Sequence, residues 1–78
     1  MGKVMPLNLL PPGHFGRVKA LVALDPLRRR MMDLGLINNT LVESLRRSPS
    51  GDPTAYQFRG AVIALRSEEA AGIFVEIE

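Results

Sequence analysis

Proline and glycine divide this chain into short segments, and this spacing limits its fold more than any other feature. Pro11-Pro12-Gly13 ends a first apolar segment, Asp25-Pro26 opens a second unit, and Gly35 closes that unit. The turn-rich stretch 48–53 and the pair Arg59-Gly60 separate the later segments. Proline lacks an amide hydrogen and glycine adopts left-handed backbone freely, so both residues interrupt helices and strands. The segments between them suit short strands and one short helix.

Apolar patterning predicts where the strands lie. Over residues 16–24 it places Val18, Ala20 and Val22 on one face of a strand. Two further segments form a predicted hairpin across Arg59-Gly60. In all we expect five or six short strands, including 40–47, 54–58, 61–65 and 73–77. A small antiparallel barrel accommodates them economically, because closure removes exposed sheet edges.

Residues 25–36 carry the signals of the inserted helix. Asp25 is a favourable N-cap, and Pro26 suits the first helical position. Gly35 suits the left-handed residue past the helix end, and Leu36 the apolar contact that follows it. We therefore predict a helix of about two turns over 27–34. Its apolar stripe has the spacing i, i+4, i+7 and consists of Leu27, Met31 and Leu34.

A second, shorter helical segment is predicted near the C-terminus. Ser67 is a possible cap for one helical turn, and Glu68 and Glu69 are favourably placed at its positive end.

Composition indicates a single small domain over 1–78 without catalytic chemistry. The chain has 78 residues, no cysteine and one histidine, so disulfides and thiolate metal ligands are excluded. His14 has no second histidine or cysteine with which to share a metal ion. No serine lies in a glycine-rich elbow, and no phosphate-binding loop of the Walker type is present. We therefore expect no enzymatic activity, no cofactor and no metal site.

The longest apolar stretches, among them 20–24 and 61–65, are far shorter than the roughly 20 residues that cross a bilayer. The N-terminus also lacks the apolar run of a signal peptide. We expect a cytoplasmic protein without direct membrane insertion.

The chain has ten basic and eight acidic residues, for a net charge of +2, and five of its arginines stand in one triplet and one pair. We expect Arg28-Arg29-Arg30 and Arg46-Arg47 to face one another across the fold, joined by Arg59 and Arg66. Such residues form a solvated face, a protein-binding surface or a nucleic-acid-binding surface. Nucleic acid is the least favoured of these, because few aromatic side chains are left for base stacking.

The adjacent methionines of the predicted helix cannot both point toward the core. Met31 belongs to the apolar stripe, so Met32 is either an exposed and adaptable contact, beside Leu36, or packs under a neighbouring loop.

Several motifs, taken in order, resemble the FeoA family, the small component of bacterial ferrous iron uptake. Residues 7–13, Leu-Asn-Leu-Leu-Pro-Pro-Gly, resemble its opening motif, and 27–36, Leu-Arg-Arg-Arg-Met-Met-Asp-Leu-Gly-Leu, resemble its helix and exit. Residues 46–53 are similar to its Arg-Arg loop, and 59–66 to its Arg-Gly hairpin. Two departures stand out: Asn38-Asn39 replaces a Pro-Gly turn, and Ser44 replaces an apolar core residue, which suggests a hydrogen-bonded hydroxyl or a locally shifted strand.

The resemblance implies an SH3-like barrel with a helix inserted after the first long strand. It also implies a cytosolic accessory role beside FeoB, a membrane transporter with a GTP-binding domain. The alternatives are an SH3-like domain associated with nucleic acid, the corresponding domain of an iron-dependent regulator, and an iron-carrying subunit. Weak homo-oligomers through apolar patches near Met32 or Phe74 are a further possibility.

From these observations we predict a surface that binds the cytosolic part of FeoB and biases its conformational equilibrium. The residues predicted to form this surface are Arg29, Arg30, Met32, Leu36, Arg47 and Arg59.

Overall fold

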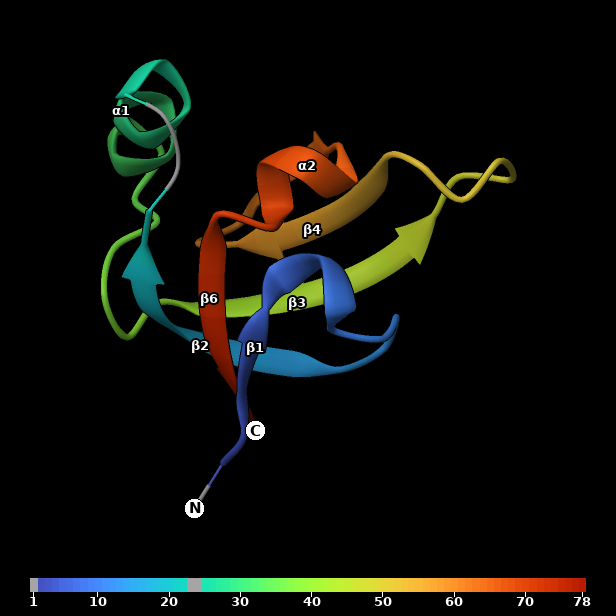
Figure 1. Cartoon of the computed structure of the whole chain (residues 1–78), viewed down its shortest axis with the longest axis horizontal. Helices are drawn as coiled ribbons and strands as arrows, with labels where there is room; N and C mark the ends of the chain where they lie inside the picture. Colours follow the sequence, from blue (N-terminus) through green and yellow to red (C-terminus); the bar gives the residue numbers. More distant parts are fainter. Residues whose placement is uncertain (1, 23–24) are drawn as a thin grey trace.

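The computed structural model describes residues 2–22 and 25–78 (Figure 1). Six strands, two α-helices and one 3₁₀ turn follow one another along the chain. They are β1 (Val4–Pro6), η1 (Leu7–Leu9), β2 (Phe15–Leu21), α1 (Asp25–Asp33), β3 (Leu41–Arg47), β4 (Thr54–Phe58), β5 (Ala61–Leu65), α2 (Ser67–Ala70) and β6 (Ile73–Ile77). No helix in the described ranges has the length and apolar character needed to cross a bilayer.

All six strands form one antiparallel sheet in the order β1-β6-β2-β3-β4-β5. The sheet curls so that β1 and β6 run steeply across β2 and β3 (Figure 1). The predicted mainly β fold with one helix inserted after the first long strand is confirmed. The strands β1 and β5 are the two edges of this sheet and do not pair with each other.

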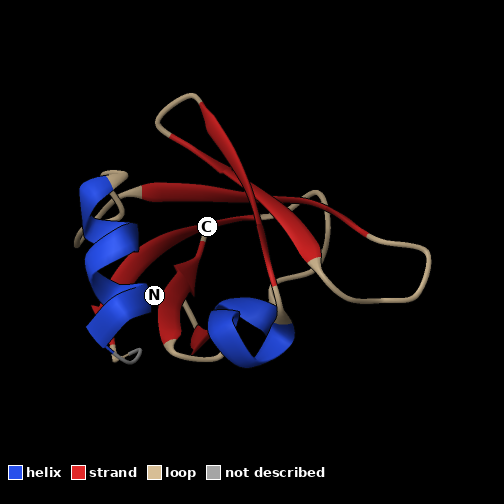
Figure 2. Ribbon diagram, turned by 90° about the horizontal axis from the view of Figure 1, so that it is seen from above, coloured by secondary structure: helices blue, strands red, loops and turns tan. Residues whose placement is uncertain are grey.

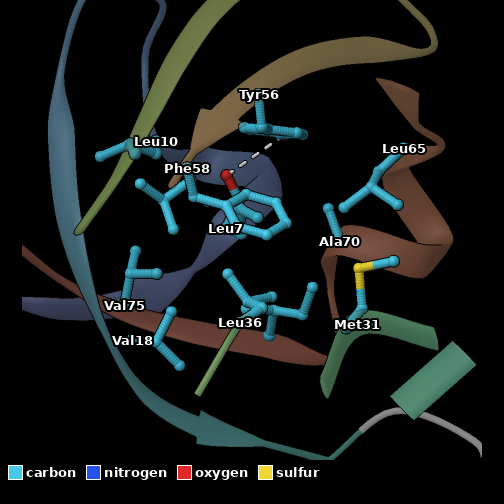
Figure 3. Packing of buried hydrophobic residues seen from close by; sticks show 12 residues of the cluster. Leu7, Leu10, Val18, Met31, Leu36, Tyr56, Phe58, Leu65, Ala70 and Val75 are labelled. Atoms are coloured by element: carbon cyan, nitrogen blue, oxygen red, sulfur yellow. Dashed lines mark hydrogen bonds between the residues drawn. The ribbon is translucent and has the colours of Figure 1, made fainter. Parts of the chain in front are cut away.

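The concave side of the sheet encloses one apolar core (Figure 3). The helix α1 contributes Met31 to it, η1 contributes Leu7, and α2 contributes Ala70. Tyr56 lies among these side chains and its hydroxyl donates a hydrogen bond to the carbonyl oxygen of Leu7, at 3.4 Å. Burying a side chain the size of leucine or methionine contributes about 1.5–3 kcal/mol. The core therefore fixes both helical segments against the sheet.

The strand β2 ends earlier than predicted. Part of the way along it, the alternation of buried and exposed side chains shifts by one residue. Val18 is fully buried, but the pairing with β6 shifts register between Val18 and Ala20. After this irregularity Leu21 packs against the core, and Val22 is 66% exposed. The predicted face of Val18, Ala20 and Val22 is therefore wrong at Val22, because a bulge reverses the alternation of side chains. The end of the predicted strand, residues 23–24, lies outside the described residues.

The helix α1 runs from Asp25 to Asp33, so it begins two residues before the predicted start and ends one residue before the predicted end. Gly35 has a φ of +95°, and the N–H of Leu36 donates to the carbonyl of Met31 at 2.9 Å. This arrangement is the Schellman ending of a helix. Leu34 is 41% exposed, because it follows the last helical residue and no longer shares the face of Met31. The predicted capping by the Asp25 side chain lies outside what the structure describes.

Two expectations at the ends of the chain change in detail. The strand that brings the total to six is β1, Val4–Pro6, and the apolar segment after it forms η1. The helix α2 is capped by Arg66, whose backbone N–H donates to the Glu69 carboxylate at 2.9 Å. Ser67, the predicted cap, is instead the first helical residue and donates to Asp52.

Asn39 and Ser44 stand at the two places where the sequence departs from the family pattern. Asn39 has a φ of +71°, so the predicted turn before β3 is present. Ser44 is fully buried, and its Oγ has no hydrogen-bond partner among the described residues. The expected hydrogen-bonded hydroxyl is therefore wrong, whereas the expected strand irregularity is confirmed by a register shift between Ser44 and Arg46.

Candidate partner-binding surface

The helix α1 lies at one side of the sheet and apart from α2 (Figure 2). Met31 anchors it in the core, so the neighbouring residues on the helix face outward. Met32 is 47% exposed, and the three arginines before Met31 are also exposed. Arg29, Arg30 and Met32 thus lie on the open face of one element, as predicted.

A groove of about 400 Å³ runs between α1, β2 and the segment after the helix. Met32 and Ile37 supply apolar surface that is about half exposed, and Lys19 and Arg28 add positive charge. Met32 also borders a second hollow, of about 420 Å³, together with Arg28, Arg29 and Asp33. The residues lining the first groove are Val18, Lys19, Ala20, Leu21, Arg28, Met32, Leu36, Ile37 and Asn38. Apolar surface beside positive charge suits a segment that carries both apolar and acidic side chains.

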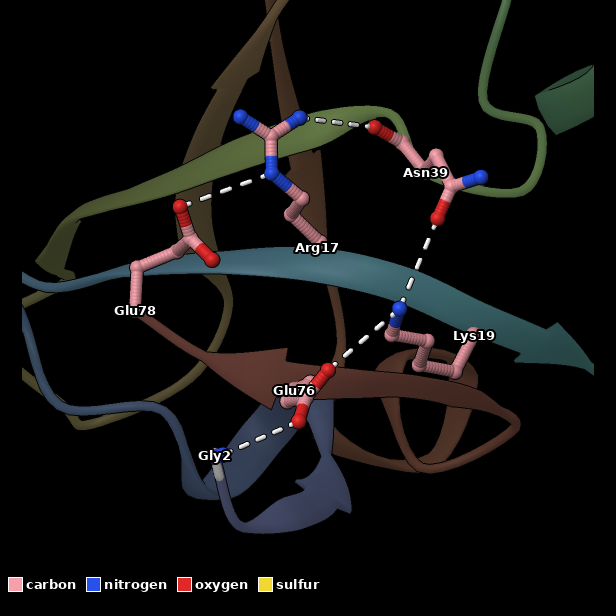
Figure 4. Close-up of polar contacts among 6 residues, drawn as sticks. All are labelled: Gly2, Arg17, Lys19, Asn39, Glu76 and Glu78. Carbon is pink, nitrogen blue, oxygen red and sulfur yellow. Dashed lines mark hydrogen bonds and ion pairs between the residues drawn. The ribbon is translucent and has the colours of Figure 1, made fainter.

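A polar network on β2 and β6 orients Lys19 beside this groove (Figure 4). The Lys19 ammonium lies 3.3 Å from the Glu76 carboxylate and donates to the Asn39 side-chain oxygen at 3.4 Å. Arg17 pairs with Glu78 at 3.4 Å and donates to the Asn39 carbonyl at 3.0 Å. Exposed pairs of this kind contribute little to stability. The contacts of Lys19 with Glu76 and Asn39 hold its amine near the turn that borders the groove.

Arg59 joins the predicted surface to the end of α1. Its Nε–H donates to the carbonyl oxygen of Gly35 at 2.9 Å. A Cβ at position 35 would lie 2.6 Å from Arg59 Cδ, so the absence of a side chain at Gly35 makes room for the arginine. The sequence predicts Arg59 both as a turn residue and as part of this surface, and the fold places its side chain against the end of the helix.

Two residues of the predicted surface, Leu36 and Arg47, do not lie on it with the others. Leu36 is 1% exposed and belongs to the core, so its predicted role as a surface contact is wrong; it is drawn inward as the apolar residue of the helix ending. Arg47 ends β3 on the side of the molecule opposite α1 (Figure 1). The arginines of α1 therefore do not face Arg46 and Arg47, because β3 carries the chain away from the helix.

Arg46 and Arg47 instead border a separate groove of about 510 Å³. Its other residues are Ser48, Pro49, Pro53, Ala55 and Ala64. Arg47 is thus part of a different surface from Arg29, Arg30, Met32 and Arg59.

Titration and metal-binding chemistry add little to this surface. Within the described residues, no three histidine, cysteine or acidic side chains come together as a potential metal site. Burial raises the pKa of the Tyr56 phenol above 10.0, but this group lies in the core.

The surface residues that sequence reasoning missed are Lys19, Arg28 and Ile37. Arg28 was visible as part of an arginine triplet, whereas Lys19 and Ile37 join it only through the packing of α1 against β2.

Comparisons with known proteins agree with this architecture. A family model, the FeoA domain, matches residues 5–77. The FeoA protein of Chlorobium tepidum is similar, with 38% identity and a TM-score of 0.89 over 94% of this chain and 70% of that chain. The FeoA of Stenotrophomonas maltophilia, described as an SH3 domain protein and solved with zinc, has 29% identity and a TM-score of 0.84 over 92% of this chain and 89% of that chain.

A manganese-dependent transcriptional repressor has the same fold, with 20% identity and a TM-score of 0.84, and this chain spans 44% of it. Such low identity supports the fold alone. No curated protein matches the sequence.

Proposed function

This chain belongs to the FeoA family, which is associated with ferrous iron transport, and from this premise we propose that it is a non-enzymatic cytosolic accessory protein. It binds the cytosolic region of a FeoB-type membrane transporter and modulates it. The binding surface is the exposed face of α1, formed by Arg28, Arg29, Arg30 and Met32, with the adjacent groove. From here on we call this set the α1 surface.

The observation that carries the proposal is the combination of charge and apolar area on this one helix. Arg29 and Arg30 are exposed, and Met32 lies between two hollows. Arginine is over-represented among residues that dominate binding energy, because it offers several donors and a flat apolar face. Methionine adapts its shape to a partner. The α1 surface therefore fits a partner segment with acidic residues beside apolar ones.

The position of α1 is fixed before any partner binds. Met31 and Leu36 are buried at the end of the helix, and Arg59 is hydrogen-bonded to the Gly35 carbonyl. A surface that is already ordered loses less conformational entropy on binding. This anchoring allows a small protein to bind through one short helix.

Binding of this kind modulates a transporter only when it discriminates between states. A ligand shifts a conformational equilibrium by the difference between its affinities for the two states. We therefore expect the α1 surface to bind one nucleotide state of the transporter's cytosolic region more tightly than the other.

Charge reversal on α1 tests the proposal. In the double variant Arg29→Glu, Arg30→Glu, affinity for the purified cytosolic region of the transporter, measured by calorimetry, should fall by roughly tenfold or more. The matched control is Arg46→Glu, Arg47→Glu, which makes the same charge change on the opposite side of the molecule. The control should bind nearly as well as the wild type. If the control loses affinity and the α1 variant keeps it, the α1 surface is not the binding site.

Met32→Ala supplies a second, uncharged test. It should weaken binding by about threefold to tenfold while leaving the salt dependence unchanged, because the methionine side chain is apolar and carries no charge. Val62→Ala removes a comparably exposed apolar side chain away from α1, since Val62 is 62% exposed and Met32 47% exposed. No change in affinity for Met32→Ala would limit the binding surface to the arginines.

A further inference from the structure

The strand β5 is an edge of the sheet without the features that usually protect such edges. It pairs with β4 in continuous register, from Phe58 opposite Ala61 to Thr54 opposite Leu65. Its five residues include no charge, no proline and no bulge. Native edges are commonly blunted by charges, prolines, bulges or short length, because an open edge pairs with other strands.

The opposite edge differs. The strand β1 has three residues and ends at Pro6, which has no N–H to offer. Lys3 precedes it with a positive charge. The contrast singles out β5 as the edge that is open to another strand.

Hairpin geometry indicates which backbone groups of β5 point outward. The turn Arg59-Gly60 has φ values of +50° and +76°, as in the two-residue turn that fits antiparallel hairpins. In such a hairpin the residues next to the turn, Phe58 and Ala61, form a hydrogen-bonded pair, and the pairs then alternate. Ala64 and Val62 therefore fall in the non-hydrogen-bonded positions of the β4–β5 ladder. Their N–H and C=O groups point away from β4.

The same two residues have exposed side chains. Val62 is 62% exposed, and Ala64 is also exposed. No other hydrogen bond engages their backbone groups within the described part of the chain. The edge thus offers two donors, two acceptors and a small apolar surface.

We propose that this edge binds the β5 strand of a second copy of the chain, antiparallel about a two-fold axis. With Ile63 on the axis, Val62 of one copy lies opposite Ala64 of the other, and the reverse. Both residues then form hydrogen-bonded pairs, giving four backbone hydrogen bonds across the interface. On the outer face the larger side chain of Val62 lies opposite the smaller side chain of Ala64 in both pairs. The strand is therefore complementary to itself.

The charges that flank β5 are compatible with this register. Arg66 of one copy lies opposite Gly60 of the other, so no two arginines face each other directly. The side chain of Arg59, next to Gly60, is hydrogen-bonded to the Gly35 carbonyl. An uncharged edge also favours an equally uncharged partner strand over a charged one. The interface is small, so the dimer is weak and forms at high protein concentration.

Sedimentation velocity over about 10 µM to 1 mM of the whole chain tests this pairing. The wild type should show a concentration-dependent increase toward a dimer. Val62→Lys should remain monomeric, because it places two charges in the paired edge. Ala64→Pro should do the same, because it removes an outward N–H that does not pair with β4. The matched control Val22→Lys charges a valine that is 66% exposed but lies outside β5, and it should dimerise like the wild type.

Amide resonances and unfolding curves make the outcome decisive. On dilution, shifts of the wild type should concentrate at the N–H groups of Val62 and Ala64. Both variants should unfold cooperatively by circular dichroism, which separates loss of pairing from loss of the fold. A wild type that stays monomeric throughout, or variants that dimerise as well as the control, would overturn the proposal. A dimer abolished in Met32→Ala but kept in Val62→Lys would also overturn it, since association would then involve α1.

Discussion

The Nε–H of Arg59 donates a hydrogen bond to the carbonyl oxygen of Gly35, with 2.9 Å between nitrogen and oxygen. The hydroxyl of Thr40 donates to the same carbonyl at 3.1 Å. The last carbonyls of a helix region lack intrahelical partners, so side chains that bind them fix the exit of the chain. Through these two bonds the β4–β5 turn and the start of β3 hold the end of α1. The α1 surface is therefore positioned in part by Arg59, which lies 24 residues from Gly35 in the sequence.

The close approach at Gly35 leads to the first prediction. Gly35→Ala should lower the free energy of unfolding, measured in urea, by about 2 kcal/mol. Left-handed backbone costs an alanine about 1–2 kcal/mol. The added Cβ would lie 2.6 Å from Arg59 Cδ, so the arginine must move and lose its hydrogen bond, at about 1 kcal/mol.

Gly51→Ala is the matched control for backbone strain. Gly51 has a φ of +93°, close to the +95° of Gly35, but nothing lies within 4 Å of a Cβ built there. It should therefore cost about 1 kcal/mol less than Gly35→Ala. In the double variant Gly35→Ala, Arg59→Ala the two single-variant costs should sum to more than the measured total, because both arise from the same hydrogen bond. Equal costs at positions 35 and 51 would show that the interaction with Arg59 contributes no free energy.

Two buried hydroxyls near the start of β3 should respond to deletion with opposite signs. The Thr40 hydroxyl accepts from the Ile37 N–H at 3.1 Å and donates to Gly35, whereas the Ser44 hydroxyl has no partner among the described residues. Thr40→Val should lower the free energy of unfolding by about 1 kcal/mol, because the Gly35 carbonyl loses a donor and the Ile37 N–H keeps only the Gly35 carbonyl as acceptor. Ser44→Ala should raise it by up to about 1 kcal/mol. Chemical denaturation measures both, and a destabilised Ser44→Ala protein would mean that its hydroxyl is satisfied in solution.

Local signals in the sequence predict the helix ending and the hairpin well. Gly35 and Leu36 fix the stop of α1, and Arg59-Gly60 fixes the turn between β4 and β5. In each case the determining interactions lie within a few residues. The exposure of Arg29, Arg30 and Met32 follows in the same way, because helical periodicity sets it once Met31 is buried.

Non-local packing decides what the sequence pattern misses. The strand β1 is three residues long and is defined only by its pairing with β6. Val22 is exposed because of a bulge, which alternation alone does not reveal. Arg47 resembles the arginines of α1 in composition, but the direction of β3 carries it to the far side. The groove beside α1 likewise depends on how the helix packs against β2.

Asp52 ties the loop between β3 and β4 to α2, and its removal should loosen both. Its Oδ1 accepts from the Ser67 N–H at 2.8 Å and from the Ser67 hydroxyl at 3.1 Å. The carboxylate thus caps the first helical N–H of α2, next to the bond between the Arg66 N–H and the Glu69 carboxylate. Asp52→Ala should lower the free energy of unfolding by about 1 kcal/mol, the usual effect of losing a cap.

Hydrogen exchange locates the same effect. In Asp52→Ala the amides of Ser67 and of the loop should exchange faster, while those of β2 and β6 should keep their protection relative to global unfolding. Asp52→Asn retains an acceptor oxygen and should recover most of the stability. Faster exchange throughout the sheet would instead indicate a global role for this side chain.

Tyr56 should make the protein sensitive to alkaline pH. Burial is the largest cause that raises the pKa of its phenol above 10.0, although the Thr54 hydroxyl and the Arg47 guanidinium lower it. The folded state therefore holds the phenolic proton more tightly than the unfolded state does. This contribution to stability is complete below pH 10 and is lost as the pH rises through the folded pKa.

Tyr56→Phe isolates this contribution. In urea titrations over about pH 8–11 the wild type should lose stability more steeply than the variant, because only the wild type carries the phenol. At neutral pH the variant should lose at most about 1 kcal/mol, because the bond to the Leu7 carbonyl is long, at 3.4 Å. Tyr56 is the one tyrosine of the chain, so the absorbance of tyrosinate reports its ionisation without overlap. Parallel stability curves, or ionisation at the pKa of a free phenol in the folded protein, would show that Tyr56 is not buried as described.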